Sequence, residues 1–369
     1  MTYLDNGATS FPKPLPVLQA VARAMTRWTN PGRGGYPAAM AAAEGVYRCR
    51  EQAAALFDCQ TEQVVLTSNC THGLNIAIGS LVRPGGRVLI SGFEHNAVTR
   101  PLYGLGAATI VAGRKLFDRE DTLSRFEDGL KQRPEAAVFT HVSNVFGYIL
   151  PVEEMAALCR QYGVPFILDA AQSAGSLEVS LEKLGAAYIA MPGHKGLLGP
   201  QGTGLLLCGD LPQPLIRGGT GSDAILQDMP AYLPDRLEAG TVNVPGIAGL
   251  EAGLRYIRQT GIRTIGRREQ RQAARCAAGL EKLGMKVFSG RYQAGTVSFQ
   301  PGMDCQDAAE KLGKLGIAVR AGLHCAPLAH ESAGTLERGT VRVSFGHDAQ
   351  DAHCDRLLVA ASKLPGYVM

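Results

Sequence analysis

The stretch Met191-Pro192-Gly193-His194-Lys195-Gly196 decides how the rest of this sequence is interpreted. It follows an apolar run at 186–190 and precedes a glycine-rich tail at 197–204, a pattern that predicts a tight turn leaving a buried strand. A lysine held in such a place is desolvated, which lowers its pKa and makes its amine nucleophilic. A surface lysine beside an ordinary turn is the simpler interpretation of these residues alone, so other parts of the chain must decide.

Short apolar runs alternate with helical patterns along much of the chain. The runs lie at 63–67, 87–91, 108–112, 136–142, 165–169, 187–191 and 204–208. Helices are predicted at 15–27, 38–57, 122–132 and 152–162. This alternation predicts an α/β fold with a mostly parallel seven-stranded sheet that is covered on both faces. Because such sheets bind ligands at the carboxyl ends of their strands, the informative residues are expected just after each run.

The C-terminal part of the sequence has a different pattern. It contains a segment rich in Gly, Pro and Asp, a helical segment, and a segment of alternating strands and helices, at 211–245, 246–283 and 286–348, respectively. We therefore predict a large α/β domain of residues 16–250 and a smaller α+β domain formed by residues 1–15 and 251–369. The small domain would carry the loop that contains Cys325.

Composition narrows the class of protein. With 46% hydrophobic and 19% charged residues and a formal net charge of +4 over 369 residues, the chain resembles an ordinary globular protein. Its arginines at 263–275 are predicted to form the solvated face of a helix, and no aromatic-interleaved basic patch argues for nucleic-acid binding. We expect neither a secretory signal nor a membrane-spanning segment. The nine cysteines are odd in number and lack Cys-x-x-Cys spacing, so we expect reduced thiols and a cytoplasmic protein.

Polar residues follow five of the runs in an order that suits one cofactor. In chain order they include Thr71, His95, Asn144, Asp169 and Gln172, and then Lys195. Thr71 stands at a helix start, where free N–H groups can bind an anion such as phosphate. A carboxylate such as Asp169 after a buried strand is costly unless paired, and a pyridinium N–H is a suitable partner. With a nucleophilic lysine, these residues form the set that a pyridoxal phosphate (PLP) enzyme needs.

The sequence resembles the cysteine desulfurase and selenocysteine lyase family, a branch of the class V aminotransferases among PLP enzymes of the type I fold. The resemblance runs nearly end to end. It is carried by Tyr3-Leu4-Asp5-Asn6, Asn30-Pro31-Gly32-Arg33-Gly34, Glu94-His95, Ser143-Asn144, Asp169-Ala170-Ala171-Gln172, Gly193-His194-Lys195, Glu238-Ala239-Gly240-Thr241 and Arg320-Ala321-Gly322-Leu323-His324-Cys325-Ala326. It implies a homodimer whose active sites are shared across the interface.

The resemblance also implies a role for each matching residue. The catalytic residues are Lys195, which forms a Schiff base with PLP, His95, which stacks on the ring, and Cys325. The cofactor is held by Cys70, Thr71, His95, Asn144, Asp169, Gln172, His194 and Lys195, while Thr241 reaches the phosphate from the partner subunit. The substrate is bound by Asn144, Arg320 and Arg342. The Arg342 guanidinium matches a carboxylate clamp, since its fork suits bidentate binding. No metal is implied.

Cys325 decides the reaction. In this family, a cysteine at this place attacks the substrate sulfur and carries it as a persulfide, and a loop beside a cation such as Arg320 favours the thiolate. A buried structural cysteine is the alternative interpretation. We predict that L-cysteine becomes L-alanine while Cys325 passes the sulfur to an acceptor protein or small thiol. Lys195 would remove the Cα proton while the ring held by Asp169 accepts the electrons.

Other functions fit some of the same residues. A selenocysteine lyase acting on L-selenocysteine shares the whole cofactor site, and a class V transaminase or C–S β-lyase would release a keto acid. A P-loop is disfavoured because Gly196 follows the lysine. A zinc site would need a fourth ligand besides His324, Cys325 and His330. A non-catalytic sulfur carrier would need no Schiff-base lysine. The sequence departs from the family pattern at Cys70, His72, Pro192 and Leu323.

Overall fold

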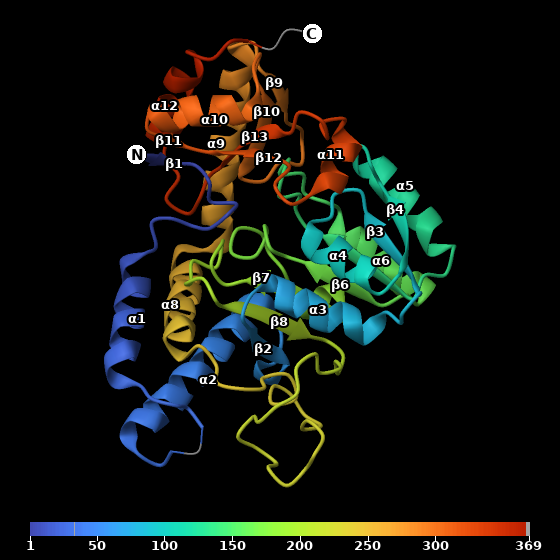
Figure 1. Ribbon diagram of the computed structural model, residues 1–369, viewed down its shortest axis with the longest axis vertical. Coiled ribbons are helices and arrows are strands. Elements are labelled where there is room, and N and C mark those ends of the chain that lie inside the picture. Colours follow the sequence, from blue (N-terminus) through green and yellow to red (C-terminus); the bar gives the residue numbers. More distant parts are fainter. Residues whose placement is uncertain (33, 367–369) are drawn as a thin grey trace.

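The computed structural model describes residues 1–32 and 34–366, so that Arg33 of the predicted motif at 30–34 lies outside the described residues. Figure 1 shows a large α/β body and a smaller one that contains the first and the last of the described residues. The chain begins in the smaller body, crosses to the larger one, and returns along the consecutive helices α8 (Val244–Thr260) and α9 (Ile262–Lys282).

A seven-stranded sheet lies at the centre of the larger body. In order across the sheet, its strands are β2 (Val64–Thr67), β8 (Gly204–Cys208), β7 (Tyr188–Pro192), β6 (Phe166–Asp169), β5 (Ala136–Thr140), β3 (Arg87–Ser91) and β4 (Ala108–Ala112). Within this sheet β8 runs in the direction opposite to the other strands, and it pairs antiparallel with β2 and β7. Each predicted run ends within two residues of the strand observed, and the predicted fold class is confirmed.

Helices cover both faces of this sheet. One face is covered by α3 (Cys70–Leu81) and α4 (Asn96–Gly104). The other is covered by α2 (Pro37–Phe57), α5 (Arg119–Leu130), α6 (Val152–Tyr162), α7 (Leu181–Leu184) and α8, with α1 (Leu15–Arg27) packed on α8 and a 3₁₀ turn at Thr61–Gln63. None of the helices in the described ranges is both long and apolar enough to cross a membrane.

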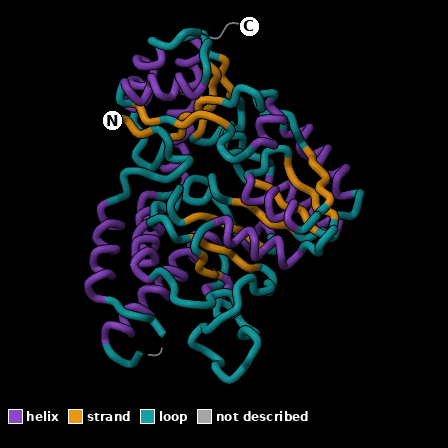
Figure 2. The backbone as a smooth tube through the Cα atoms, in the orientation of Figure 1, coloured by secondary structure: helices purple, strands orange, loops and turns teal. Residues whose placement is uncertain are grey.

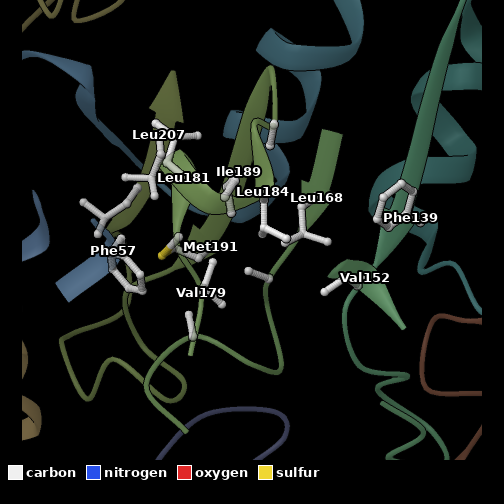
Figure 3. Close-up of a cluster of buried hydrophobic side chains, with 14 of the residues drawn as sticks. Phe57, Phe139, Val152, Leu168, Val179, Leu181, Leu184, Ile189, Met191 and Leu207 are labelled. Carbon is white, nitrogen blue, oxygen red and sulfur yellow. The ribbon is translucent and has the colours of Figure 1, made fainter. Parts of the chain in front are cut away.

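The two-sided cover explains the continuous apolar runs. Successive side chains of a strand point to opposite faces, so a strand buried on both sides needs apolar residues throughout. In β7, Ile189 and Met191 belong to the core on one face and Tyr188 to the core on the other. Figure 3 shows the first of these cores, with Phe57 and Leu207 in the same cluster as Met191.

The smaller body is built on an antiparallel sheet. Its strands, in order, are β12 (Arg320–Gly322), β13 (Thr340–Ser344), β10 (Thr296–Gln300) and β9 (Lys286–Phe288). Beside it, β1 (Thr2–Tyr3) pairs with β11 (Ile317–Ala318), and the helices are α9, α10 (Cys305–Lys314) and α12 (Asp351–Ala361). The short helix α11 (Pro327–Ala333) extends from this body towards α4 and α5 (Figure 1).

The junction of the two bodies differs in detail from the sequence pattern. The single helical stretch expected at 246–283 is two helices, because Gly261 adopts a φ of +87°, which favours glycine and ends α8. The predicted domain boundary between residues 250 and 251 falls inside α8. We propose the same division into two domains, supported by the separate sheets. The arginine run lies on α9, where Arg263 and Arg271 form exposed ion pairs, as predicted for a solvated face.

The segment 209–243 contains no helix or strand, as the loop coloured teal at the base of Figure 2 shows. A buried ion pair holds its end in place. Glu238 accepts hydrogen bonds from Nη1 and Nη2 of Arg50 at 2.8 and 2.6 Å, and from the Leu66 N–H at 2.7 Å. Both charged side chains are only 9% exposed.

We expect Glu238→Ala to lower the free energy of unfolding by about 3–5 kcal/mol, because it leaves the buried Arg50 guanidinium without its partner. Urea unfolding followed by circular dichroism measures the change. The control is Glu178→Ala, which removes the exposed partner of Arg263 and should leave the unfolding midpoint unchanged. Equal midpoints for the two variants would contradict a stabilising role for Glu238.

Candidate active site

A cavity of about 100 Å³ lies at the edge of the large sheet where the parallel strands end. It is lined by eight of the nine residues predicted to hold the cofactor, namely Cys70, Thr71, His95, Asn144, Asp169, Gln172, His194 and Lys195. Larger hollows of about 450 and 460 Å³ lie elsewhere and contain none of these residues. Folding therefore gathers residues from five strand ends into one place.

Lys195 lies on the turn that leaves β7. The turn is compact, because the Gly193 N–H donates to the Thr203 carbonyl at 2.8 Å and a Cβ at Gly193 would lie 2.1 Å from Thr203 Oγ1. Burial lowers the pKa of the Lys195 amine, and the nearby Asp169 carboxylate opposes this shift. The turn thus holds an amine whose neutral, nucleophilic form is favoured.

Asp169 ends β6 and is 3% exposed. Its Oδ1 accepts hydrogen bonds from the Ala171 N–H at 2.9 Å and from the Cys70 thiol at 3.5 Å. Burial raises the pKa of Asp169, while the Ala171 bond and Lys195 oppose the shift. Burial also raises the pKa of Cys70 well above the usual thiol value, so Cys70 stays a donor. A cationic ring N–H would stabilise the charged form of Asp169.

His95 is held in one orientation and one tautomer. It precedes α4, and its Nδ1 accepts a hydrogen bond from the Ala97 N–H at 3.0 Å. Burial, with a further contribution from Lys195, lowers the pKa of His95 to about 4, so the ring is neutral near pH 7. Because Nδ1 accepts, the proton resides on Nε2. A neutral, fixed imidazole is suited to stacking on an aromatic ring.

One end of the cavity is suited to an anion. The N–H groups of Cys70 and Thr71 open α3 and have no intrahelical partner, whereas the His72 N–H donates to Asn69 Oδ1 at 2.8 Å. These N–H groups and the helix dipole favour negative charge. His194 adds a neutral imidazole, whose pKa burial lowers to about 4 and whose buried Nδ1 has no partner among the described residues.

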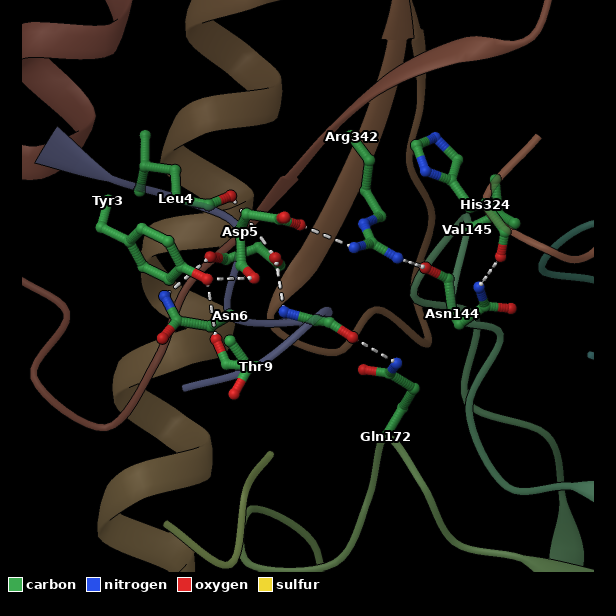
Figure 4. A network of polar contacts seen from close by, with 12 residues as sticks. Tyr3, Leu4, Asp5, Asn6, Thr9, Asn144, Val145, Gln172, His324 and Arg342 are labelled. Atoms are coloured by element: carbon green, nitrogen blue, oxygen red, sulfur yellow. Dashed lines mark hydrogen bonds and ion pairs between the residues drawn. The ribbon is translucent and has the colours of Figure 1, made fainter. Parts of the chain in front are cut away.

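Asn144 lines the cavity and also contacts residues of the small domain, and Figure 4 shows these contacts. Its Nδ2 donates to the His324 carbonyl at 2.7 Å, and its own carbonyl accepts from Arg342 Nη1 at 3.0 Å. Arg342 Nη2 donates to Asp5 at 2.7 Å. Asn144 Oδ1 and Arg342 Nε are buried without a partner in the described chain. Buried polar groups of this kind are costly when unsatisfied, so both are suited to a polar ligand.

The loop of Cys325 is docked beside the cavity. The Cys325 carbonyl accepts a hydrogen bond from the Asn96 N–H at 2.8 Å, next to His95 in the chain. His324 and Cys325 both have positive φ, +49° and +56°, which side-chain-bearing residues rarely adopt. All nine cysteines lie in the described part of the chain, and Cys325 is the exposed one. A strained, anchored and exposed thiol is suited to reaction rather than to packing.

Some predicted residues lie outside the cavity. Arg320 is exposed on β12, directly opposite Arg342 on β13, and neither side chain lines the cavity. Thr241 is exposed in a separate hollow of about 300 Å³ with Glu238. Since Thr241 is predicted to act in the partner subunit, its role stays a prediction. No role was predicted for Asp5 from the sequence. An acidic residue directly after the apolar Leu4 was nevertheless a signal that could have indicated a buried polar contact.

PLP carries a phosphate, a ring nitrogen and an aldehyde, and the cavity has a counterpart for each. The start of α3 fits the phosphate, Asp169 fits a protonated ring nitrogen, and Lys195 fits the aldehyde. The unpartnered Asn144 Oδ1 and His194 Nδ1 are further polar atoms without a protein partner in the described residues. The residues present therefore fit this cofactor.

Comparisons with known proteins agree with the site. The model of the family "Aminotransferase class-V" matches residues 2–357. A probable cysteine desulfurase of Methanothermobacter thermautotrophicus is 33% identical, covering 93% of this chain and 89% of that protein. One of Pyrococcus abyssi is 34% identical with the same coverage. The apo structure of a cysteine desulfurase from Thermococcus onnurineus NA1 matches with a TM-score of 0.89 and 31% identity, covering 98% of this chain and 94% of that one.

The fold and the site together define a PLP-dependent enzyme of the type I fold. Its relatives narrow the class further. The chain belongs to the class V aminotransferase family and, within it, to the cysteine desulfurases. The resemblance predicted from the sequence is confirmed.

Proposed function

We propose that this protein is a PLP-dependent cysteine desulfurase, which converts L-cysteine to L-alanine and holds the sulfur as a persulfide on Cys325. The observation that carries this proposal is the anchoring of the exposed Cys325 loop on the large domain, at the residue after His95. The relatives reported above are cysteine desulfurases, which favours this function over selenocysteine lyase.

Each residue of the cavity has a separate proposed role in the removal of the Cα proton. Bound PLP supplies an electron-accepting ring that stabilises negative charge at Cα of the substrate. Lys195 would hold the cofactor through its amine, and its free amine would take the Cα proton. Asp169 would favour the protonated form of the ring nitrogen, and the neutral His95 would pack against the ring. Arg342, whose Nε has no partner among the described residues, and Asn144 would hold the substrate carboxylate, which is the role predicted for both.

The sulfur step belongs to Cys325. Its thiolate attacks the substrate sulfur, so an S–S bond forms as the Cβ–S bond breaks, and the electron pair stays with the substrate. A proton then adds at Cβ, and alanine is released after Lys195 returns a proton to Cα. The persulfide on Cys325 is consumed by an acceptor protein or small thiol, which the exposure of this cysteine allows.

We infer a homodimer with a shared active site. Thr241 is exposed and lies outside the cavity of its own chain, which supports its predicted contact with the partner's cofactor. Sedimentation of the holoenzyme tests the dimer: a monomer that retains full activity would contradict it.

We also propose a cytoplasmic location, supported by the nine free cysteines, since a reducing compartment keeps thiols unpaired.

The proposed function predicts a specific product pattern. The holoenzyme incubated with L-cysteine should release L-alanine, and mass spectrometry should find a mass increase of one sulfur atom on the peptide containing Cys325. L-Selenocysteine should be tested in parallel, with both products quantified. Release of pyruvate in place of alanine would indicate a β-lyase, and release of 3-mercaptopyruvate would indicate a transaminase. Alanine from L-selenocysteine alone would indicate a selenocysteine lyase.

A further inference from the structure

The N-terminal residues 2–13 form a strap that runs from the small domain to the active-site lysine. At its start, β1 pairs with β11. The Asp5 carboxylate then accepts from Arg342, the Gly7 N–H donates to Ser344 Oγ at 2.7 Å, and the Gly7 carbonyl accepts from Gln172 Nε2 at 3.0 Å. Figure 4 shows the strap between Arg342 and Gln172. The strap therefore contacts two predicted site residues, Arg342 and Gln172, before it reaches the peptide group that joins His194 to Lys195.

At its far end the strap holds one carbonyl group, that of His194. This carbonyl accepts from the Ser10 N–H at 3.0 Å, from the Thr9 and Ser10 hydroxyls at 3.1 Å each, and from Lys13 Nζ at 2.7 Å. It belongs to the peptide group that joins His194 to Lys195. Donors arranged around that carbonyl restrict rotation of the peptide plane, which sets the direction of the Lys195 side chain.

Lys13 is the strongest of these donors because it carries a charge. Its Nζ also donates to Ser10 Oγ at 2.7 Å, and no carboxylate pairs with it among residues 1–32 and 34–366. Burial lowers the pKa of Lys13 to about 8, so this half-buried ammonium is held at a cost in desolvation. Lys13 therefore forms a charge-assisted hydrogen bond to a backbone carbonyl rather than an ion pair.

We propose that Lys13 is a positioning residue: by holding the His194 carbonyl, it orients Lys195 for its reaction with the cofactor. The inference rests on the proposed function, because it assumes that Lys195 bonds to PLP. Lys13 itself does not line the cavity and takes no part in the chemistry. Its effect is on how readily the Lys195 amine reaches the cofactor aldehyde.

The test compares Lys13→Met, which removes the charge and the donor, with Lys13→Arg, which keeps both. Apoprotein is mixed with PLP, and the absorbance of the covalent linkage gives its rate constant and the dissociation constant. We expect Lys13→Met to slow linkage and to weaken PLP binding by about tenfold each, the scale of one charged hydrogen bond. Lys13→Arg should stay within about threefold of the wild type. Lys183→Met, at an exposed position on α7, is the matched control.

Thermal unfolding of the apoproteins separates positioning from folding. Equal rate constants in Lys13→Met and the wild type would overturn the inference. It would also be overturned if both Lys13→Met and Lys13→Arg lost apoprotein stability and both formed the covalent bond to PLP slowly. If Lys13→Met does not fold, Thr9→Val removes another donor to the same carbonyl and should slow linkage about threefold; no slowing there overturns the inference. Failure of the wild type to bind PLP would instead refute the proposed function.

Discussion

Lys195→Ala is expected to lower kcat for alanine formation by at least about 10⁴-fold. In the proposed mechanism the lysine has two functions, covalent attachment of the cofactor and removal of the Cα proton, and one substitution removes both. Its position cannot be filled by a neighbour, because the compact turn after β7 is held by Gly193 and Thr203. Alanine quantified by chromatography gives kcat, and mass spectrometry after borohydride reduction locates the cofactor on the chain.

The matched control for this prediction is Lys183→Ala, which changes an exposed lysine on α7. Its activity and its cofactor content should equal those of the wild type. In the Lys195→Ala protein, reduction should attach no cofactor to the polypeptide. A reduced adduct on another lysine, with activity retained, would show that Lys195 is not the Schiff-base residue.

Cys325→Ser is expected to lower alanine release from L-cysteine by at least about 10³-fold, because removal of a nucleophile removes the whole covalent route. The hydroxyl preserves the size of the side chain, and the backbone contact of this loop to Asn96 does not involve it. The protein should therefore fold and retain its cofactor absorbance. Alanine is measured under multiple-turnover conditions with a reducing acceptor present.

Two comparisons sharpen this result. Cys59→Ser, a change at a half-buried cysteine away from the cavity, should leave alanine release unchanged. The substitution Cys325→Ser should lower the activity with L-selenocysteine far less than the activity with L-cysteine, because selenium leaves more readily than sulfur. Unchanged alanine release from L-cysteine in this variant would rule out the persulfide mechanism.

The large domain was predictable because burial on both faces of its sheet requires continuous apolar runs, which can be recognised in the sequence. Strands such as β7 and β8 must be apolar at every position, so their runs stand out in the chain. The break between α8 and α9 was harder to predict from the sequence. Gly261 breaks the helix through its positive φ, yet a glycine inside a helical pattern is often tolerated.

The candidate site was predictable in part for a related reason. Parallel strands end at one edge of the sheet, so residues placed just after each run, such as Asp169 and Lys195, meet there whatever the exact packing. Arg342 and Cys325 are different, because they come from the small domain. Their positions depend on how that domain docks, through the Asn144 and Asn96 contacts, which no local pattern encodes.

Local patterns in the chain thus determine the fold class and the strand ends, and they predict Lys195 and Asp169 as site residues, because these follow from burial and sheet geometry. Contacts between distant segments decide the rest. Asp5 pairs with Arg342, and Lys13 donates to the carbonyl of His194, the residue before Lys195. Both contacts join residues that are far apart in the sequence and meet only in the folded chain. A polar residue in a loop looks the same in sequence whether it faces water or a partner from another domain, so its role emerges when the packing is known.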